Sequence, residues 1–303
     1  MNLGIAASYI RGVYINYSQM ESLAFAFVDA STPFNYREVV KAVLLAPVAC
    51  IRVFTCLCVV WLNKMMYTHK MIGVIDNTIL LSIYLVRLSV GFYYVPVKGL
   101  ENLREAYDVG AVVIYNHISF MDSMILMRDM VFSMVTTTAY EHNALIGWYF
   151  QYTDAIFVNA KEKSTTQRIV ERIKDNSTKH MVAIAPEGTF SNGHVLLKFK
   201  SGAFVAKVPV LPTLLRYPNK CVNPTWISRT ALSTCYRVLT QFVNYATLEY
   251  LPVIYPVESE TAQEYADRTR KIMAAALGVP MVEYDLSDKL RFIESLKSKK
   301  HAD

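Results

Sequence analysis

The sequence predicts an α/β domain with a central mixed sheet flanked by helices, preceded by an N-terminal membrane-embedded helical segment. Three observations favour this fold class. Hydrophobic residues make up 53% of the 303 residues and charged residues only 18%, which is more apolar than an ordinary soluble domain. Long apolar runs lie within the first hundred residues. After Lys98, short β-rich runs alternate with helical patterns, as they do in α/β domains.

The N-terminal part contains one strong candidate for a membrane helix. Residues 1–36 form an extension to which we assign no function. From Ala42 to Leu62, 21 residues carry a single charge, Arg52, and about 20 apolar residues suffice to span a bilayer. A central arginine costs roughly 2.5–3.5 kcal/mol on insertion scales. A re-entrant or interfacial helix pair therefore competes with a true span.

A second apolar run extends from Thr78 to Val97. It contains Arg87 and ends in the β-like sequence Phe92-Tyr93-Tyr94-Val95. This pattern predicts an amphipathic helix that leads into a strand. We therefore predict a membrane-associated helical segment over residues 37–97.

Residues 98–290 are predicted to form the globular domain, followed by a basic tail over residues 291–303. Short apolar runs bounded by polar residues indicate its strands. The predicted strands are Ala111 to Tyr115, Thr153 to Asn159, Met181 to Ala185 and Val208 to Arg216. Between them, Ser164 to Lys179 places isoleucine and valine at helical spacing among charges, which predicts a surface helix.

A histidine and a carboxylate lie close together after the first of these strands. The segment Asn116-His117-Ile118-Ser119-Phe120-Met121-Asp122 follows it and opens a predicted helix. With Ser119 as helix N-cap, Asp122 sits in the first turn, where its carboxylate can reach back toward His117. A carboxylate bonded to one imidazole nitrogen leaves the other free to accept a proton from an alcohol. The spacing therefore predicts an acid/base pair.

Blander interpretations of this segment stay open. In one alternative, Ser119 and Asp122 only cap the helix as a capping box, and His117 is a surface residue without a function. A serine nucleophile is disfavoured, because Ser119 and His117, two residues apart near a helix start, do not face each other. We expect no metal site, since the other histidines lack metal-ligand spacing. They are His69, His142, His180, His194 and His301.

A second polar cluster follows the strand predicted at Met181 to Ala185. The loop from Pro186 to Gly193 contains a carboxylate, hydroxyls and two glycines, with Lys198 and Lys200 close behind. Such a loop can present backbone N–H groups to a phosphate or an oxyanion. The alternative is an ordinary turn, since Ser, Asn and Gly gather in turns generally.

Together these segments resemble the glycerolipid acyltransferases of the lysophosphatidic acid acyltransferase type, especially their lysophosphatidylcholine acyltransferase branch. The family's first motif, N-H-x-S-x-x-D, is matched from Asn116 to Asp122, and its third, P-E-G-T, from Pro186 to Thr189. The second motif resembles Asp154 to Asn159, and the fourth Val208 to Pro212. Segments like those of the branch are Asn192-Gly193, Leu197 to Phe204, Leu215 to Asn219 and Ala275 to Pro280.

The resemblance implies the glycerolipid acyltransferase fold and an acyl-CoA-dependent enzyme that acylates the free glycerol hydroxyl of a lysophospholipid. His117 and Asp122 are then the catalytic pair, and backbone amides near them steady the oxyanion. The implied substrate-binding residues are Asn116, Ser119, Phe157, Glu187, Gly188, Thr189, Lys200 and Arg216. Acyl-CoA is a co-substrate, and we expect no bound cofactor.

Two departures from the family pattern bear on the acceptor. Ala160 and Phe190 stand where the second and third motifs often carry arginines, which the family associates with the acceptor's phosphate. Their absence weakens the case for a dianionic acceptor such as lysophosphatidic acid. Lys161, Lys163 or Lys200 would substitute only as point charges. No D-x-D-x-D-G loop occurs, so we expect no calcium control.

Three other functions compete with this one. A lysophosphatidic acid acyltransferase is the runner-up within the family. A membrane thioester hydrolase would use the same pair to pass the acyl group to water. A non-catalytic lipid-binding or scaffold protein would retain the capping box for structure alone.

The net charge of +6 suits an anionic membrane surface, CoA or nucleic acid, so charge alone does not choose. With the motifs, we expect acyl-CoA, a lysophospholipid and the bilayer as partners, and no nucleic acid. Three of the five cysteines lie in the apolar stretch, and no disulfide framework is expected. We expect an endoplasmic reticulum membrane protein with a cytosolic catalytic face.

Overall fold

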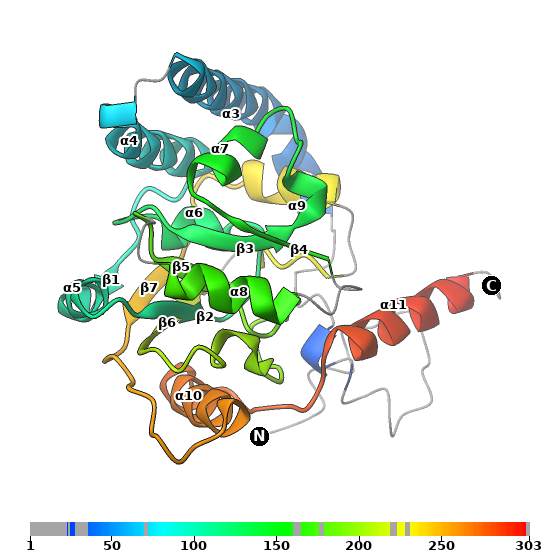
Figure 1. The fold of residues 1–303 in the computed structure, drawn as a ribbon. Helices are drawn as coiled ribbons and strands as arrows, with labels where there is room; N and C mark the ends of the chain where they lie inside the picture. The colour runs from blue at the N-terminus through cyan, green and yellow to red at the C-terminus, as the bar shows by residue number, and fades with distance from the viewer. Residues whose placement is uncertain are drawn as a thin grey trace.

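The computed structural model describes residues 23, 25–27, 36–69, 72–159, 165–175, 179–218, 223–227 and 231–300. Its strands form a seven-stranded sheet in the order β1-β7-β6-β2-β5-β3-β4 (Figure 1). The pairing is parallel except between β6 and β7. The predicted mixed sheet flanked by helices is confirmed.

The strands are β1 (Val97–Lys98), β2 (Val112–Tyr115), β3 (Ser133–Thr137), β4 (Ile156–Val158), β5 (Val182–Ile184), β6 (Val210–Arg216) and β7 (Thr247–Tyr250). The helices are α3 (Tyr36–Thr68), α4 (Ile72–Val90), α5 (Leu100–Asp108), α6 (Asp122–Leu126), α7 (Gly147–Tyr152), α8 (Thr165–Lys174), α9 (Ala231–Leu239), α10 (Ala262–Leu277) and α11 (Leu286–Lys300). Two short 3-10 turns, η1 (Thr138–Tyr140) and η2 (Ser201–Ala203), complete the assignment.

Each of the four predicted strands contains an observed one, namely β2, β4, β5 and β6. The helix predicted to lead from the second apolar run into a strand is observed as α4 followed by β1, but the strand begins at Val97 and not at the β-like residues Phe92 to Val95. The amide of Phe92 donates instead to the carbonyl of Arg87 at the end of α4. This segment therefore closes the helix before the chain reaches the sheet.

The sheet separates two apolar cores. Val113 and Tyr115 of β2 face one core, while Val112 and Ile114 face the other, as expected from the alternation of side chains along a strand. The first core is covered by residues of α4, α5, α6 and α9. The second is covered by residues of α8 and α10. We refer to these as the α4 face and the α10 face of the sheet.

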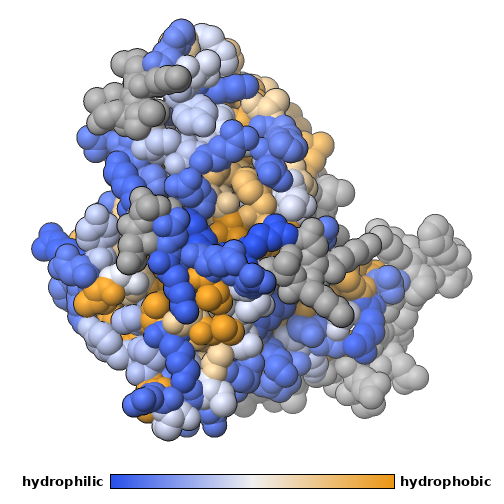
Figure 2. Space-filling model, in the orientation of Figure 1, coloured by the Kyte–Doolittle hydropathy of each residue, from blue (hydrophilic) through white to orange (hydrophobic). Residues whose placement is uncertain are grey.

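The N-terminal hairpin of α3 and α4 lies on the α4 face (Figure 1). Residues Val43–Thr68 of α3 are long and apolar enough to cross a membrane. The rest of the protein covers little of this stretch, because only 17% of its most apolar 18 residues is buried. In Figure 2, one group of hydrophobic residues lies on the upper right of the molecule, while the upper left is mostly hydrophilic; α3 runs across the top in Figure 1. Its most exposed large apolar residues include Val43, Leu44, Ile51, Phe54 and Trp61.

Arg52, near the centre of α3, is buried against the globular domain. One of its terminal nitrogens donates to the carbonyls of Leu239 and Gln241, at 2.6 and 2.5 Å. The other donates to the carbonyl of Phe242 and the hydroxyl of Tyr93, both at 3.3 Å. The charge that the sequence marked as costly is therefore stabilised by hydrogen bonds to backbone carbonyls at and beyond the C-terminus of α9.

The predicted basic tail at residues 291–303 does not begin as a separate segment. Residue 291 lies inside α11, and the next residue, Phe292, is buried in a small core with Phe27. Phe292 explains why the chain is helical here, because burying its aromatic ring stabilises a helix that charged residues alone would not. The proposed domain boundary at residue 98 remains a proposal, and the extension at residues 1–36 lies largely outside the described residues.

Candidate active site

His117 and Asp122 are brought together at the carboxyl edge of the sheet. His117 follows the end of β2 by two residues, and Asp122 begins α6. Nδ1 of His117 lies 2.9 Å from Oδ2 of Asp122. Because a carboxylate only accepts hydrogen bonds, Nδ1 carries the proton and Nε2 is the basic nitrogen. The His117 side chain is 24% exposed, whereas that of Asp122 is fully buried.

The Asp122 carboxylate is held by several donors. Besides the imidazole, Oδ2 accepts from the amides of Ile118 and Ser119, at 2.7 and 2.9 Å. Oδ1 accepts from the hydroxyl of Tyr217 at 2.7 Å. These bonds compensate the carboxylate for the loss of water. Burial, followed by the nearby carboxylate, raises the pKa of Tyr217 well above its ordinary value, so the phenol remains a donor.

Ser119 is not the N-cap of α6, contrary to the sequence-based prediction. The cap position is Met121, which makes no side-chain capping bond. The Ser119 hydroxyl donates to the carbonyl of Pro224 at 2.7 Å. The chain makes a turn first, in which the amide of Asp122 donates to the Ser119 carbonyl. The Asp122 carboxylate thus binds the amides of Ile118 and Ser119, while the Ser119 hydroxyl accepts from the amide of Met121 at 3.2 Å.

Glu187 supports the backbone of His117 from the Pro186 to Gly193 loop. Its Oε1 accepts from the amide of His117 at 2.7 Å, and its Oε2 from the amide of Leu197 at 3.0 Å. The amide of Ser191 donates to the His117 carbonyl at 2.9 Å. Burial raises the pKa of Glu187 to about 8, although both amide bonds lower it. This carboxyl group faces inward and positions the histidine.

These contacts correct the expectation that amides beside the pair steady the oxyanion. The amide of His117 donates to Glu187, and those of Ile118 and Ser119 donate to Asp122. All three are therefore engaged within the protein. Their role is to fix the side chains of Asp122 and Glu187, so an oxyanion must draw on other donors.

The remaining predicted substrate residues fall into three groups. Asn116 is buried and exchanges two hydrogen bonds with the backbone of Leu215, at 2.9 and 2.8 Å. Like Ser119 and Glu187, it supports the edge of the sheet, and its buried polar atoms are bonded to protein. The predicted substrate contact of these three side chains stays a prediction, and the structure shows their bonds to protein.

Thr189 and Lys200 lie at the loop itself. The Thr189 hydroxyl accepts from the Lys289 ammonium group of α11 at 3.1 Å. Gly188 has a φ of +64°, and a Cβ there would lie 2.8 Å from the Nζ of Lys200. The positive φ favours glycine here, and the end of the Lys200 side chain lies over it.

Arg216 and Phe157 are not placed against the pair. The Arg216 guanidinium donates to Glu249 of β7 and to the Ala276 carbonyl near the end of α10, both at 2.6 Å. It therefore holds α10 to the sheet. Phe157 lies on edge strand β4, where its ring packs against Phe150 with 6.2 Å between centroids.

Three aromatic residues near the pair escaped the sequence-based assignment. The ring centroid of Phe190 lies 4.0 Å from that of His117, and Trp226 packs on Phe190 at 5.8 Å. Phe190 thus covers the imidazole at the position where the family pattern often has arginine. Tyr217 was also missed as a partner of Asp122. Both Phe190 and Tyr217 lie within or beside matched motifs, but sequence spacing gives no sign of these contacts.

Within the part of the chain that the structure describes, no group of three or more His, Cys, Asp and Glu side chains could hold a metal ion. The absence of a bound cofactor remains a sequence-based prediction. What the site offers chemically is a half-covered imidazole base. Its tautomer is fixed by the buried Asp122 carboxylate, and its backbone is held by the carboxyl group of Glu187.

Comparison with known proteins agrees with this arrangement. Residues 94–216 match the family model for Acyltransferase, and these residues include β2, the pair and the P-E-G-T loop. The crystal structure of the 1-acyl-sn-glycerophosphate acyltransferase PlsC from Thermotoga maritima is similar in fold, with a TM-score of 0.55 and 17% identity. The likeness covers 80% of this chain and 95% of that one.

Similar proteins of established name include several lysophospholipid acyltransferases. The lysophospholipid acyltransferase LPCAT4 of Xenopus tropicalis is 34% identical over 65% of this chain and 39% of its own. The lysophosphatidylcholine acyltransferase of Drosophila melanogaster is 36% identical over 65% and 38%. LPCAT4 of Mus musculus is 30% identical over 83% and 52%. The chain therefore carries a domain of the acyltransferase family, and the matches span between about two fifths and half of these relatives.

Replacing Tyr217 with phenylalanine tests its support of Asp122. The variant removes one donor from a buried carboxylate, and we expect the turnover number in an acyl-transfer assay to fall about tenfold with little change in KM. Tyr94→Phe, at a tyrosine that is 76% exposed, is the matched control. An unchanged turnover number in Tyr217→Phe would show that the phenol does not position the pair.

The raised pKa of Glu187 predicts a pH-dependent stability. Between the ordinary value of 4.5 and about 8, the unfolded chain loses this proton while the folded protein keeps it. The contribution of Glu187 to stability therefore falls as pH rises through this window. We expect the unfolding temperature of the wild type to decline more from pH 5.5 to 8.5 than that of Glu187→Gln, which cannot ionise.

Thermal unfolding in detergent at several pH values measures this difference. Glu101→Gln, at an exposed glutamate of α5, should keep the wild-type pH dependence. Equal declines in wild type and Glu187→Gln would mean that Glu187 does not titrate in this range.

Proposed function

We propose that the protein transfers a fatty acyl group from acyl-CoA to the free glycerol hydroxyl of a lysophospholipid. The observation that carries this proposal is the contact of 2.9 Å between His117 Nδ1 and Asp122 Oδ2, in a domain of the acyltransferase family. Among the described residues, Nε2 makes no hydrogen bond. A neutral imidazole with one nitrogen fixed and the other available is suited to deprotonate an alcohol.

The proposed reaction needs no acyl-enzyme. Nε2 of His117 takes the proton of the glycerol hydroxyl while the hydroxyl oxygen attacks the thioester carbonyl. The resulting imidazolium is stabilised by Asp122. When the tetrahedral intermediate collapses, the carbon–sulfur bond breaks, and the proton on His117 passes to the departing thiolate of CoA. The products are a diacyl phospholipid and CoA.

The acceptor class rests on the relatives and on the surroundings of His117. Several similar proteins are named as lysophosphatidylcholine or lysophospholipid acyltransferases. Here Phe190 packs on the imidazole and supplies no charge for a dianionic head group. The other arginine position of the pattern, Ala160, lies outside the described residues. Together these points favour a lysophospholipid with an esterified phosphate over lysophosphatidic acid.

The hairpin of α3 and α4 supports membrane association. Because Arg52 docks the middle of α3 onto the globular domain, we propose that α3 lies along the membrane surface with its exposed apolar face in the lipid, rather than crossing it. This matches the interfacial alternative weighed from the sequence. Lipid acceptors could then reach the edge of the sheet from the bilayer.

An endoplasmic reticulum location with a cytosolic catalytic face is part of the proposal. Its support is chemical. The described cysteines Cys50, Cys56, Cys58 and Cys235 are free thiols, as is usual for chains in a reducing compartment.

The proposed function is tested with membranes that contain the full chain, oleoyl-CoA and a panel of lysophospholipids. We expect CoA release that depends on the acceptor, is highest with lysophosphatidylcholine or a related head group, and falls at least about a hundredfold in His117→Ala. His142→Ala, at an exposed histidine, should behave as wild type.

Each other outcome names a different function. A preference for lysophosphatidic acid would mean that the protein is a lysophosphatidic acid acyltransferase. CoA release without acceptor that still needs His117 would indicate a thioester hydrolase. An absence of release with every acceptor would indicate a lipid-binding protein.

A further inference from the structure

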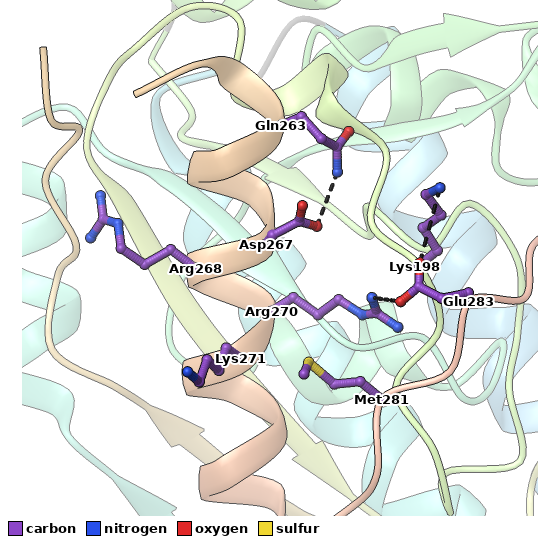
Figure 3. A pocket seen from close by; sticks show the side chains of 8 residues that line it. All are labelled: Lys198, Gln263, Asp267, Arg268, Arg270, Lys271, Met281 and Glu283. Atoms are coloured by element: carbon purple, nitrogen blue, oxygen red, sulfur yellow. Dashed lines mark hydrogen bonds and ion pairs between the residues drawn. The ribbon is translucent and has the colours of Figure 1, made fainter. Parts of the chain in front are cut away.

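A hollow of about 670 Å³ lies beside α10, away from the catalytic pair. Its walls are α10 on one side and the chain around Lys198 and Glu283 on the other (Figure 3). Its volume lies within the range of roughly 300–1,000 Å³ that is typical of small-molecule sites. The function proposed above assigns no role to it.

The hollow combines cations with groups that suit an organic base. Lys198 is 53% exposed, and its nearest carboxylate oxygen, on Glu283, is 4.0 Å away. Lys271 is exposed at the same site. Met281 offers an apolar surface that is 45% exposed. The Asp267 carboxylate accepts from the amide of Gln263 at 3.0 Å.

Arg270 builds the wall of this hollow. Its side chain is 4% exposed and donates to Glu283 at 2.7 Å. It also donates to the carbonyl of Leu196 at 3.1 Å. The guanidinium group thereby ties α10 to both chain segments opposite it, and the hollow is defined by a buried polar contact rather than by surface side chains alone.

The hollow is connected to the catalytic pair through Glu187. One oxygen of this carboxyl group accepts from the amide of His117, and the other accepts from the amide of Leu197. Lys198 follows directly, so its Cα lies about 3.8 Å from that of Leu197. Glu187 therefore links the backbone beside the hollow, at Leu197, with the backbone of His117.

The hollow and the membrane hairpin lie on opposite faces of the sheet. Residues of α10 pack on the α10 face, and those of α4 on the α4 face. If α3 faces lipid, the hollow opens toward the aqueous side. It is therefore placed for the water-soluble part of a ligand whose apolar part enters from the membrane.

We propose that this hollow binds the phosphorylated nucleotide end of acyl-CoA, an inference that rests on the function proposed above. Lys198 and Lys271 pair with its phosphates. Met281 packs on the adenine, and the Asp267 and Glu283 carboxylates can accept hydrogen bonds from its amino group. Two carboxylates disfavour a bare phosphate ion, so the mixed lining fits a nucleotide better. The thioester then lies at the sheet edge, and the acyl chain points toward the hairpin.

The test compares two acyl donors that differ only in the nucleotide. With oleoyl-CoA, Lys271→Glu and Lys198→Gln should each raise the donor KM about fivefold and leave the turnover number unchanged. With oleoyl-pantetheine, which lacks the nucleotide, the same variants should match the wild type. Lys98→Glu, at an exposed lysine of β1, controls for the change in net charge.

A binding measurement separates this inference from the proposed function. In the full-length His117→Ala background, calorimetric titration with CoA should show a dissociation constant about fivefold weaker after Lys271→Glu. Equal CoA affinity with and without Lys271→Glu, or an equal KM effect on both acyl donors, would overturn the nucleotide site. Acyl transfer that fails with every acceptor while CoA binding still depends on Lys271 would overturn only the proposed transfer reaction.

Discussion

The buried carboxylate of Asp122 is the constraint on which the rest of the site depends. A charge with no exposed surface needs donors on all sides, and here they come from the imidazole, two amides and a phenol. Those donors belong to the turn after β2 and to the chain just after β6. Satisfying one carboxylate therefore fixes the histidine tautomer and the local backbone path together.

The same rule recurs where the membrane hairpin meets the domain. Arg52 lies within an apolar helix, and its charge is tolerated because backbone carbonyls at and after the end of α9 accept hydrogen bonds from it. Charge burial thus aligns an apolar helix along one face of the sheet. The opposite face carries α10 and its basic hollow. A substrate with an apolar tail and a polyanionic head would have its two ends divided between these faces.

The sequence predicted the parts of this structure that depend on local pattern. Continuous apolar runs indicated β2, β5 and β6, and the spacing of His117 and Asp122 indicated their contact. Strand β3, Ser133–Thr137, escaped because serine and threonine interrupt its apolar pattern. Tyr217 escaped because its partner lies 95 residues away. The inward orientation of Glu187 depends on two amides supplied by distant turns, which motif spacing does not reveal.

The central claim is that His117 and Asp122 act as one unit. The direct measurement is the turnover number of His117→Ala, Asp122→Asn and the double variant in the same membranes, with thermal unfolding to confirm folding. Residues that act as a unit show strongly non-additive losses. We predict that the double variant is no slower than His117→Ala within about threefold. Losses that multiply in the double variant would contradict the account, because the two side chains would then contribute independently.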